Sequence, residues 1–382
     1  MLETIDSILS DFRHCFSRKA AFYWFLIIIL GFIIRCDHHG ITSFIRWLFL
    51  NPEYYDPILR SLRTTSWSLE ILLVHWVKVV MSMYPLIEFN GRPLLIGDGI
   101  KVAKEAKKMP AVKSLHQDSE NSGKAEYILG HHCGFVGLLI GSMKKTFCLP
   151  LHGQLHEGLE GIRPAEGRAG QPATLVTHMA HLVLKKAKQT GMLCYATLDA
   201  YFSVGPAFLI FKEAVNEKGE QWVHLITRAK DNYVGYFNPE DSSKRFREEE
   251  KVYLIKIFDF PWLFEKMELT IYGHVKTVKY YCANLLWKPI KGLVRFVCVM
   301  DGEDRYILMC SDLKLSPIQI ITIYSYRSKI EVMFLFLKHL LGGFCYHFWT
   351  KAFPKLKRGE KLQCIQPKHN NVTKDRSNDR SH

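Results

Sequence analysis

Residues 324–338 spell YSYRSKIEVMFLFLK, in which Tyr324, Arg327, Glu331 and Lys338 are separated by two, three and six residues. At 100° per residue, all four lie on one face of an α-helix. A carboxylate on that face can bind a metal ion, and Arg327 and Lys338 can hold a phosphate beside it. The alternative is a solvated face with an ordinary Arg–Glu pair four residues apart.

The helix that carries these residues is predicted to be long and largely buried. Ser316-Pro317 is a good N-cap with proline in the first turn, and no other proline interrupts residues 316–351. The run Met333–Leu337 makes the helix apolar nearly all round, which predicts burial. Because buried charges need partners or a purpose, this context favours a functional role for Glu331.

Composition favours a nucleic acid or an anionic surface as partner. The chain has 382 residues, 48% of them hydrophobic, so it can bury a large core, and its net charge is +14. Its ten scattered cysteines form no C-x-x-C pair, which predicts reduced thiols in a cytoplasmic protein. Cys36–His39 and His131–Cys133 have the composition of zinc ligands but not the spacing of a structural zinc site.

The chain divides by character into five parts. The first includes the apolar run 20–34, which at 15 residues is shorter than the roughly 20 needed to span a bilayer. A buried helix is therefore predicted there, with a membrane anchor as the alternative. The parts are an N-terminal helical DNA-binding region (1–88), the first part of an α/β core (89–230), a β-rich insertion (231–315), the final core helix carrying Glu331 (316–354) and a disordered polar tail (355–382).

Two predicted core strands end in an aspartate: 93–99 contains Asp98, and 194–199 ends at Asp199. Residues 154–172 are Gly-rich and polar, which predicts a loop. The other core segments predicted are strands at 127–141, 146–153 and 223–226, and a helix at 174–189. The strands predicted in the insertion are 233–237, 252–258, 268–272, 275–284, 293–299 and 305–310.

Asp98, Asp199 and Glu331 form a set of oxygen-only ligands, which suits Mg²⁺ or Mn²⁺. Two such ions about 3.5–4 Å apart can activate a water or a 3′-hydroxyl and stabilise the leaving oxygen of a phosphodiester. Strand ends are a suitable platform because strands hold carboxylates rigidly. Taken singly, Asp98 before Gly99 also fits a turn, and Asp199 also fits a helix cap.

The order Asp98, Asp199, β-rich segment and Y-x2-R-x3-E-x6-K resembles a bacterial insertion-sequence DDE transposase of the cut-and-paste class. The resemblance spans roughly residues 40–355. It implies an α/β fold with a ribonuclease H-like mixed sheet flanked by helices, a β-rich insertion and an N-terminal helical domain. The segments that add to it are LIGDGIKVAKEAKKMPAVKSLHQDSEN (95–121), LDAYFSVGPAF (198–208), HLITRAKDN (224–232) and ILMCSDL (307–313).

The resemblance implies a DNA transposase that binds transposon end repeats, cleaves phosphodiester bonds with two Mg²⁺ or Mn²⁺ ions and joins the 3′-hydroxyl to target DNA. It also implies double-stranded DNA as partner, a homodimer on synapsed ends, and a cytoplasmic, nucleoid-associated protein without a membrane partner. The residues it assigns are Asp98, Asp199 and Glu331 as catalytic metal ligands, Tyr324, Arg327 and Lys338 as phosphate contacts, and Arg228 and Lys230 as further DNA contacts.

Two tryptophans of the insertion, Trp262 and Trp287, are candidates to stack on a base flipped from the DNA end, as in related enzymes; core packing is the alternative for each. Two other functions stay open. A purely hydrolytic metal nuclease would use the same acids. A catalytically inactive DNA-binding remnant is the second, because Phe334–Leu337 stand before Lys338 where polar residues are expected, and related proteins continue with further helices.

Overall fold

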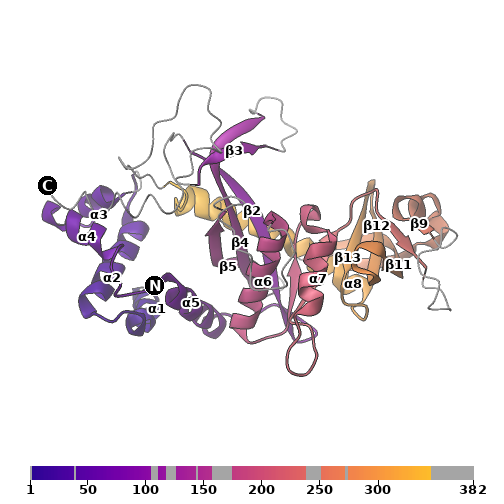
Figure 1. Cartoon of the computed structure of the whole chain (residues 1–382), viewed down its shortest axis with the longest axis horizontal. Helices are drawn as coiled ribbons and strands as arrows, with labels where there is room; N and C mark the ends of the chain where they lie inside the picture. Colours follow the sequence, from indigo (N-terminus) through magenta and orange to yellow (C-terminus); the bar gives the residue numbers. More distant parts are fainter. Residues whose placement is uncertain are drawn as a thin grey trace.

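A large mixed β-sheet forms the centre of an elongated α/β molecule, with helices on both faces (Figure 1). The N-terminal helices lie at one end and the β-rich segment that precedes the last helix lies at the other. The predicted tail 355–382 and nearly all of the predicted loop 154–172 lie outside the described residues. The computed structural model describes residues 2–37, 40–104, 111–117, 126–142, 145–156, 174–237, 251–271 and 274–345.

The described N-terminal residues up to Met83 form short helices around a small aromatic core. Phe12, Phe16, Phe22 and Val79 are buried in it. The side chain of Ser68 caps helix α5 by accepting a hydrogen bond from the amide of Ile71. The elements are α1 (Leu2–Asp11), η1 (Phe12–Cys15), α2 (Lys19–Ile34), α3 (Ile41–Trp47), η2 (Pro52–Tyr54), α4 (Tyr55–Ser61) and α5 (Leu69–Met83).

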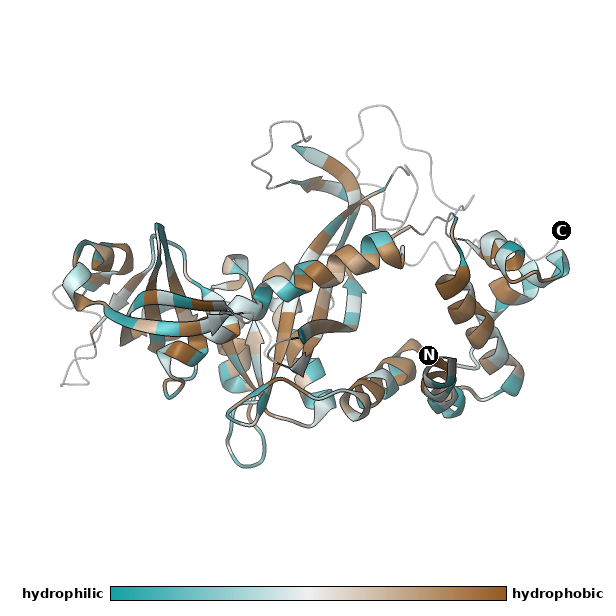
Figure 2. Ribbon diagram, turned by 180° about the vertical axis from the view of Figure 1, so that it is seen from behind, coloured by the Kyte–Doolittle hydropathy of each residue, from teal (hydrophilic) through white to brown (hydrophobic). Residues whose placement is uncertain are grey.

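The apolar helix α2 is less buried than its sequence predicts. Only Ala21, Phe22 and Gly31 are buried, whereas Tyr23 is 48% and Ile33 51% exposed. The reason is its position at the end of the molecule, where it packs on short helices and leaves an apolar side uncovered (Figure 2, brown). Among the described residues, no helix combines the length and the apolar character needed to cross a membrane.

The sheet contains thirteen strands within the described residues, in the order β3-β4-β2-β6-β7-β13-β12-β11-β8-β9, with β1 on β2, β5 on β4 and β10 on β11. Strand β2 is antiparallel to β4 and parallel to β6, and β6 is parallel to β7. The strands are β1 (Glu88–Phe89), β2 (Arg92–Ala103), β3 (Lys113–His116), β4 (Tyr127–Ser142), β5 (Lys145–Leu155), β6 (Cys194–Thr197), β7 (Val223–Arg228), β8 (Val234–Tyr236), β9 (Lys251–Tyr253), β10 (Glu265–Ile271), β11 (His274–Trp287), β12 (Gly292–Asp301) and β13 (Asp304–Cys310).

Helices cover the two faces of this sheet in separate layers (Figures 1 and 2). On one face lie α6 (Leu175–Thr190), capped by Thr174, and α7 (Gly205–Glu213). On the other face lies the last helical run, which comprises α8 (Pro317–Ser325), η8 (Tyr326–Ser328), α9 (Lys329–Leu335) and η9 (Phe336–Leu340). Strand β2 is buried from both sides: Leu95 belongs to the α6 layer, and Leu94 and Ile96 belong to the α8–α9 layer.

The last helical run differs from the single long helix that the sequence predicts. It begins as expected, with Ser316 as N-cap in a capping box. It then contains a 3₁₀ turn, η8, and a π turn, η9, and it ends near Leu341, before Gly342 with its positive φ of 59°. Its far end is also not buried, since Leu335 is 56% and Leu340 73% exposed. Only one side of the helix meets the sheet, so its apolar residues cannot all be covered.

Two other predictions about the core are wrong. The predicted strand 252–258 is a strand only up to Tyr253 and then becomes a 3₁₀ segment, η5 (Leu254–Asp259), whose Leu254, Ile257 and Phe258 are buried. Strand β2 extends to Ala103, so Asp98 lies inside the strand and not at its end or in a turn. The apolar pattern alone could not distinguish a buried 3₁₀ segment from a strand.

Candidate active site

The three predicted acidic residues converge on one guanidinium group. Nη2 of Arg327 lies 2.8 Å from Oδ2 of Asp98 and 3.8 Å from Oδ2 of Asp199, and its Nη1 lies 2.6 Å from Oε1 of Glu331. The ordinary i, i+4 pair between Arg327 and Glu331 is therefore present, but it is one part of a larger group. Residues more than 230 positions apart in the sequence meet at this point of the sheet.

Strand geometry places the two aspartates side by side. Asp98 follows Ile96 by two residues, so its side chain points to the same face of β2 as Ile96, toward the last helix. Ile96 pairs in parallel with Thr197 of β6, and Asp199 follows two residues later. Gly97 points to the opposite face, where a Cβ would lie only 2.6 Å from a methyl group of Leu198. A side chain at position 97 would therefore collide with Leu198, and glycine beside Asp98 lets β2 pack closely against α6 and the residue that follows β6.

Asp199 also keeps the role that its sequence alternative predicts. It is the N-cap of η3 (Ala200–Phe202), and its Oδ1 accepts from the amide of Tyr201. Its backbone carbonyl accepts a hydrogen bond of 2.7 Å from the hydroxyl of Thr227 on β7. One carboxylate oxygen is therefore fixed by the cap while Oδ2 stays directed at Arg327, so capping orients the acid.

Packing of α9 on the sheet sets the direction of Glu331. The ring of Phe334 meets the ring of Phe135 on β4 edge-on, with centroids 5.6 Å apart. The sulfur of Met333 lies 3.9 Å from the thiol of Cys148 on β5. Both residues are buried on the side of the helix that faces the sheet. Glu331 remains exposed at the rim of the site, so it is the most accessible of the three acids.

Burial dominates the electrostatics of Asp98. Desolvation raises the pKa of this carboxyl to about 6; Arg327 opposes the shift, and the charges of Asp199 and Glu331 add to it. Burial lowers the pKa of Arg327, but the three acids outweigh this effect and the net change is upward. Among the described residues, no hydrogen-bond partner reaches the buried Nε of Arg327. The site is therefore a cluster of negative charge held together by one cation.

Of the predicted DNA contacts, Tyr324 and Arg228 lie near the acids and two lysines do not join them. Burial raises the pKa of the Tyr324 hydroxyl. The negative charge of Asp199 raises it further, whereas the positive charges of Arg327 and Arg228 lower it. Arg228 lies at the end of β7 with its guanidinium 5.9 Å from the ring centroid of Tyr306. Lys230 and Lys338 are exposed, and neither contacts one of the three carboxylates within the described part of the chain.

Lys338 lies in the π turn η9, outside the regular α-helix that the prediction of a single helix face assumes. That prediction rests on a uniform rotation of 100° per residue, which a π turn does not follow. The exposed apolar residues around it, including Phe336 at 43% exposure, match the unusual composition noted in the sequence.

The three carboxylates are ligands that suit hard divalent cations, and the guanidinium of Arg327 lies between them. All three acids offer carboxylate oxygens, the ligands preferred by Mg²⁺ and Mn²⁺. The acids are spread around the guanidinium of Arg327, so a metal ion would take over the place of that group. Closer ligand geometry occurs elsewhere: among the described residues, the ligand atoms of His14, Cys15 and His75 all lie within 4.8 Å of one another.

The two tryptophans left open by the sequence have different environments. Trp287 is 3% exposed and packs against Phe208 and Tyr233, with centroid distances of 5.3 and 5.6 Å. Core packing is therefore its role. Trp262 is 74% exposed on η6 (Pro261–Leu263) beside Phe260. Only Trp262 is free to meet a base.

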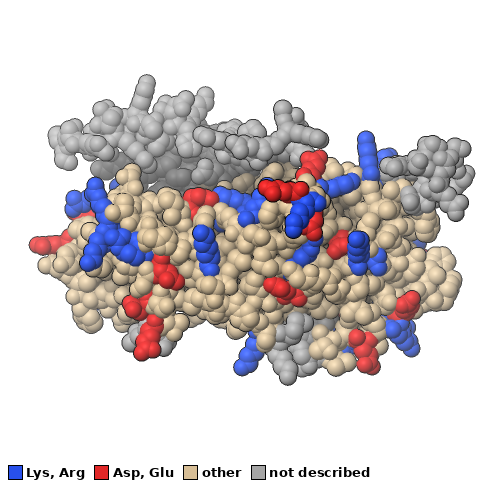
Figure 3. Space-filling view, turned by 90° about the horizontal axis from the view of Figure 1, so that it is seen from below, with Lys and Arg blue, Asp and Glu red and all other residues tan. Residues whose placement is uncertain are grey.

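The charge distribution does not form a single basic patch on the face drawn in Figure 3. Lys and Arg side chains there are interspersed with Asp and Glu across the described residues.

The chain has little similarity to known proteins. No family profile matches the chain, and no curated protein matches it significantly. Among solved structures, one match is the NurA nuclease from Sulfolobus solfataricus, with a TM-score of 0.26 and 10% sequence identity; the match covers 79% of this chain and 100% of that chain. A likeness this weak carries no argument about fold or function.

Proposed function

We propose that the chain is a divalent-metal-dependent DDE transposase with a ribonuclease H-like core. The observation that carries the proposal is the meeting of Asp98, Asp199 and Glu331 around one guanidinium group. Two further features support it. Asp98 lies within β2, Asp199 follows the parallel neighbour β6 by two residues and Glu331 lies on the last helical run. The β-rich segment from β8 to β13 stands ahead of this last acid. This is the order that the sequence resemblance implies.

In the proposed reaction the carboxylate oxygens of the three acids would hold two Mg²⁺ or Mn²⁺ ions. When bound, such ions activate a water or a 3′-hydroxyl and stabilise the leaving oxygen of the phosphodiester. Asp98 must lose its proton to serve as a ligand, and its raised pKa makes this step sensitive to pH. The rigid strands keep the two aspartates in place, so little rearrangement of the backbone is required.

The cationic and aromatic side chains around the acids would hold the DNA. Arg327, once released from the carboxylates, can donate to a phosphate in a bidentate manner. Tyr324 can donate its hydroxyl hydrogen, and Arg228 lies within the same electrostatic environment. Trp262, exposed at the far end of the β-rich segment, offers a surface for stacking on a base. Binding through phosphates predicts strong dependence on salt.

The test is cleavage and joining of the DNA that flanks the coding sequence of this protein, in Mg²⁺ or Mn²⁺. Asp98→Asn, Asp199→Asn and Glu331→Gln should each slow cleavage by about 10³-fold or more, equivalent to about 4 kcal/mol, because each removes a ligand. Glu268→Gln, at an exposed position of β10, is the matched control and should retain activity. DNA binding by the triad variants should stay within about twofold, since phosphate contacts come from other side chains.

The products distinguish the proposed activity from its alternatives. A transposase joins a supplied 3′-hydroxyl end to target DNA, whereas a nuclease yields hydrolysis alone. The inactive alternative is favoured by one observation, the exposed position of Lys338 on the π turn. Metal-dependent binding of the flanking DNA without any cleavage by the unaltered chain would replace our proposal with that of a DNA-binding remnant.

A further inference from the structure

A second group of metal-ligating side chains lies among the N-terminal helices, away from the acids. The thiol of Cys15 lies 3.7 Å from Nε2 of His14, and the rings of His14 and His75 are perpendicular with centroids 4.2 Å apart. One ligand atom from each of the three lies within 4.8 Å of the other two. Around a tetrahedral Zn²⁺, a thiolate sulfur and an imidazole nitrogen are about 3.5 Å apart, as follows from the usual bond lengths.

Aromatic packing holds these ligands in place before any ion arrives. His14 and Cys15 belong to η1 and His75 belongs to α5, which are separated by some sixty residues of chain. The ring of Phe12 joins the two elements, since its centroid lies 5.0 Å from that of His75 and 6.5 Å from that of Trp76. Cys15 itself is only 5% exposed. The site is therefore preorganised by the small core of the helical region.

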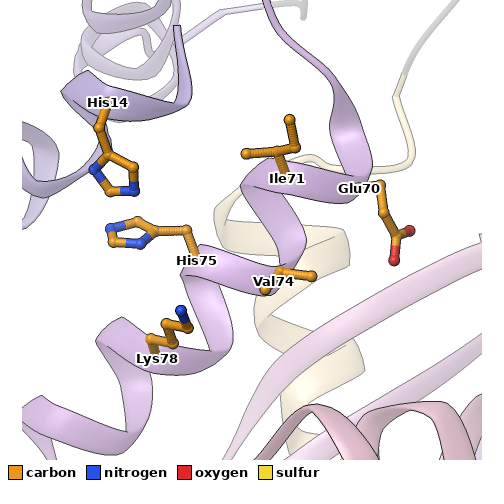
Figure 4. A pocket seen from close by; sticks show the side chains of 6 residues that line it. All are labelled: His14, Glu70, Ile71, Val74, His75 and Lys78. Carbon is orange, nitrogen blue, oxygen red and sulfur yellow. The ribbon is translucent and has the colours of Figure 1, made fainter.

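Access to the ligands is provided by a hollow of about 220 Å³ on the surface. Figure 4 shows the imidazoles of His14 and His75 facing one another across it. Lys78 and Glu70 also line the hollow, together with Ile71 and Val74. The imidazole rings of His14 and His75 therefore border a hollow that is open to solvent, and Cys15 does not line it.

An unsatisfied nitrogen points to a missing partner. Nε2 of His75 is buried and, among the described residues, no hydrogen-bond partner reaches it. Buried polar atoms are normally paired, so such a nitrogen requires an explanation. A metal ion bound at this nitrogen would supply the missing partner.

We propose that His14, Cys15 and His75 bind a zinc-type transition-metal ion. Two imidazoles and one thiolate suit Zn²⁺, and they are poor ligands for the Mg²⁺ or Mn²⁺ expected at the acids. A water molecule would complete the four-coordinate shell. The positive charge of Lys78 opposes the ion, but this lysine is exposed and can turn toward solvent. The ion would fasten η1 to α5 and so stabilise the helical region.

Cobalt substitution tests the site directly. The full chain, without an affinity tag of histidines and freed of metal by a chelator, is titrated with Co²⁺ and the absorption spectrum is recorded. The unaltered chain should show a thiolate-to-cobalt charge-transfer band and the d–d bands of a tetrahedral site, both removed by competing Zn²⁺. Cys15→Ser should abolish the charge-transfer band. His75→Ala should weaken Zn²⁺ binding by about 100-fold or more, at least the effect of losing a supporting contact.

Control variants and thermal unfolding distinguish the loss of a metal ligand from misfolding. Cys36→Ser removes an exposed cysteine outside the site, and His339→Ala removes an exposed histidine of η9; both should leave the cobalt spectrum unchanged. Zn²⁺ should raise the Tm of the unaltered chain and not that of Cys15→Ser, whereas the metal-free Tm values should agree. Absence of the charge-transfer band in the unaltered chain, or its survival in Cys15→Ser, overturns the proposal. Neither result depends on DNA cleavage.

Discussion

The acidic site on the sheet and the His–Cys–His group among the N-terminal helices (His14, Cys15 and His75) differ in how the fold balances the charge of their ligand atoms. Three carboxylates carry like charges and would repel one another, so the fold places Arg327 between them. Two neutral imidazoles and a thiol carry no charge in their resting forms. They need no counter-ion, and the fold leaves Nε2 of His75 without a partner instead.

This difference shows how each site should respond to a metal ion. At the acids an ion replaces an existing cation, so its binding must compete with an ion pair. At the histidines, no ion pair among the described residues occupies the site, and an ion has to overcome only protonation of the ligands and the charge of the exposed Lys78. The acidic site should therefore select hard divalent ions at high concentration, and the His–Cys–His group should select a zinc-type ion at low concentration.

The largest expected effect tests whether the two sites are independent. Asp199→Asn should reduce metal-dependent DNA cleavage by about 10³-fold while leaving the cobalt charge-transfer band intact. Cys15→Ser should abolish the band and change the cleavage rate by less than about twofold, since the sites use different ligands. Cleavage assays and absorption spectra of both variants make the comparison. Loss of both signals in either variant would show that the sites are coupled or that the fold has failed.

A smaller effect is expected from removing the internal cation. Arg327→Ala leaves three carboxylates without their shared partner, so the free energy of unfolding without metal should fall by about 1–3 kcal/mol near pH 8, the range for a partly buried pair. Lys276→Ala is the control because its pair with Asp301 is largely exposed, and it should cost less than about 1 kcal/mol. Urea unfolding of both variants measures the difference. Equal losses would mean that the cluster is no more than a surface ion pair.

The smallest expected effect is the pH dependence of metal binding at the acids. Burial raises the pKa of Asp98 to about 6, so its proton competes with the metal below that value. The affinity for Mn²⁺ should fall up to about tenfold for each pH unit below 6 and level off above about pH 7. The same raised pKa means that Asp98 favours the folded state at low pH and loses this contribution as pH rises from about 4 through 6. Titration calorimetry at several pH values measures the affinity; a flat profile would contradict the assigned pKa.

The sequence predicts the strands of the sheet closely because their signals are local. β-branched and aromatic runs bounded by polar turns mark β10, β11, β12 and β13, and the Thr174–Gln189 pattern marks α6. The pattern does not predict helix α7, and it predicts a strand where the 3₁₀ segment from Leu254 lies. In both cases the apolar residues are buried by tertiary packing that no short pattern reveals.

The sequence could suggest which acids meet but not how they meet. The spacing around Glu331 and the acids beside apolar strands select three carboxylates that the structure brings to one guanidinium group, and their catalytic role stays a prediction. The sequence could not show that Arg327 pairs with all three, that Asp98 lies inside β2, or that Lys338 lies in a π turn. The His14–Cys15–His75 group was missed because its halves lie on separate helices, and only the packing of Phe12 on α5 joins them.

Hydrogen bonding between β7 and β13 makes one continuous sheet of the strands that carry the acids and the strands that follow them. A displacement of β12 or β13 is thus passed through backbone hydrogen bonds to β7, β6 and β2, the strands next to Asp98 and Asp199. Bending of the β12–β13 hairpin relative to β7 would therefore strain the backbone next to the carbonyl of Asp199, which Thr227 of β7 holds by a hydrogen bond.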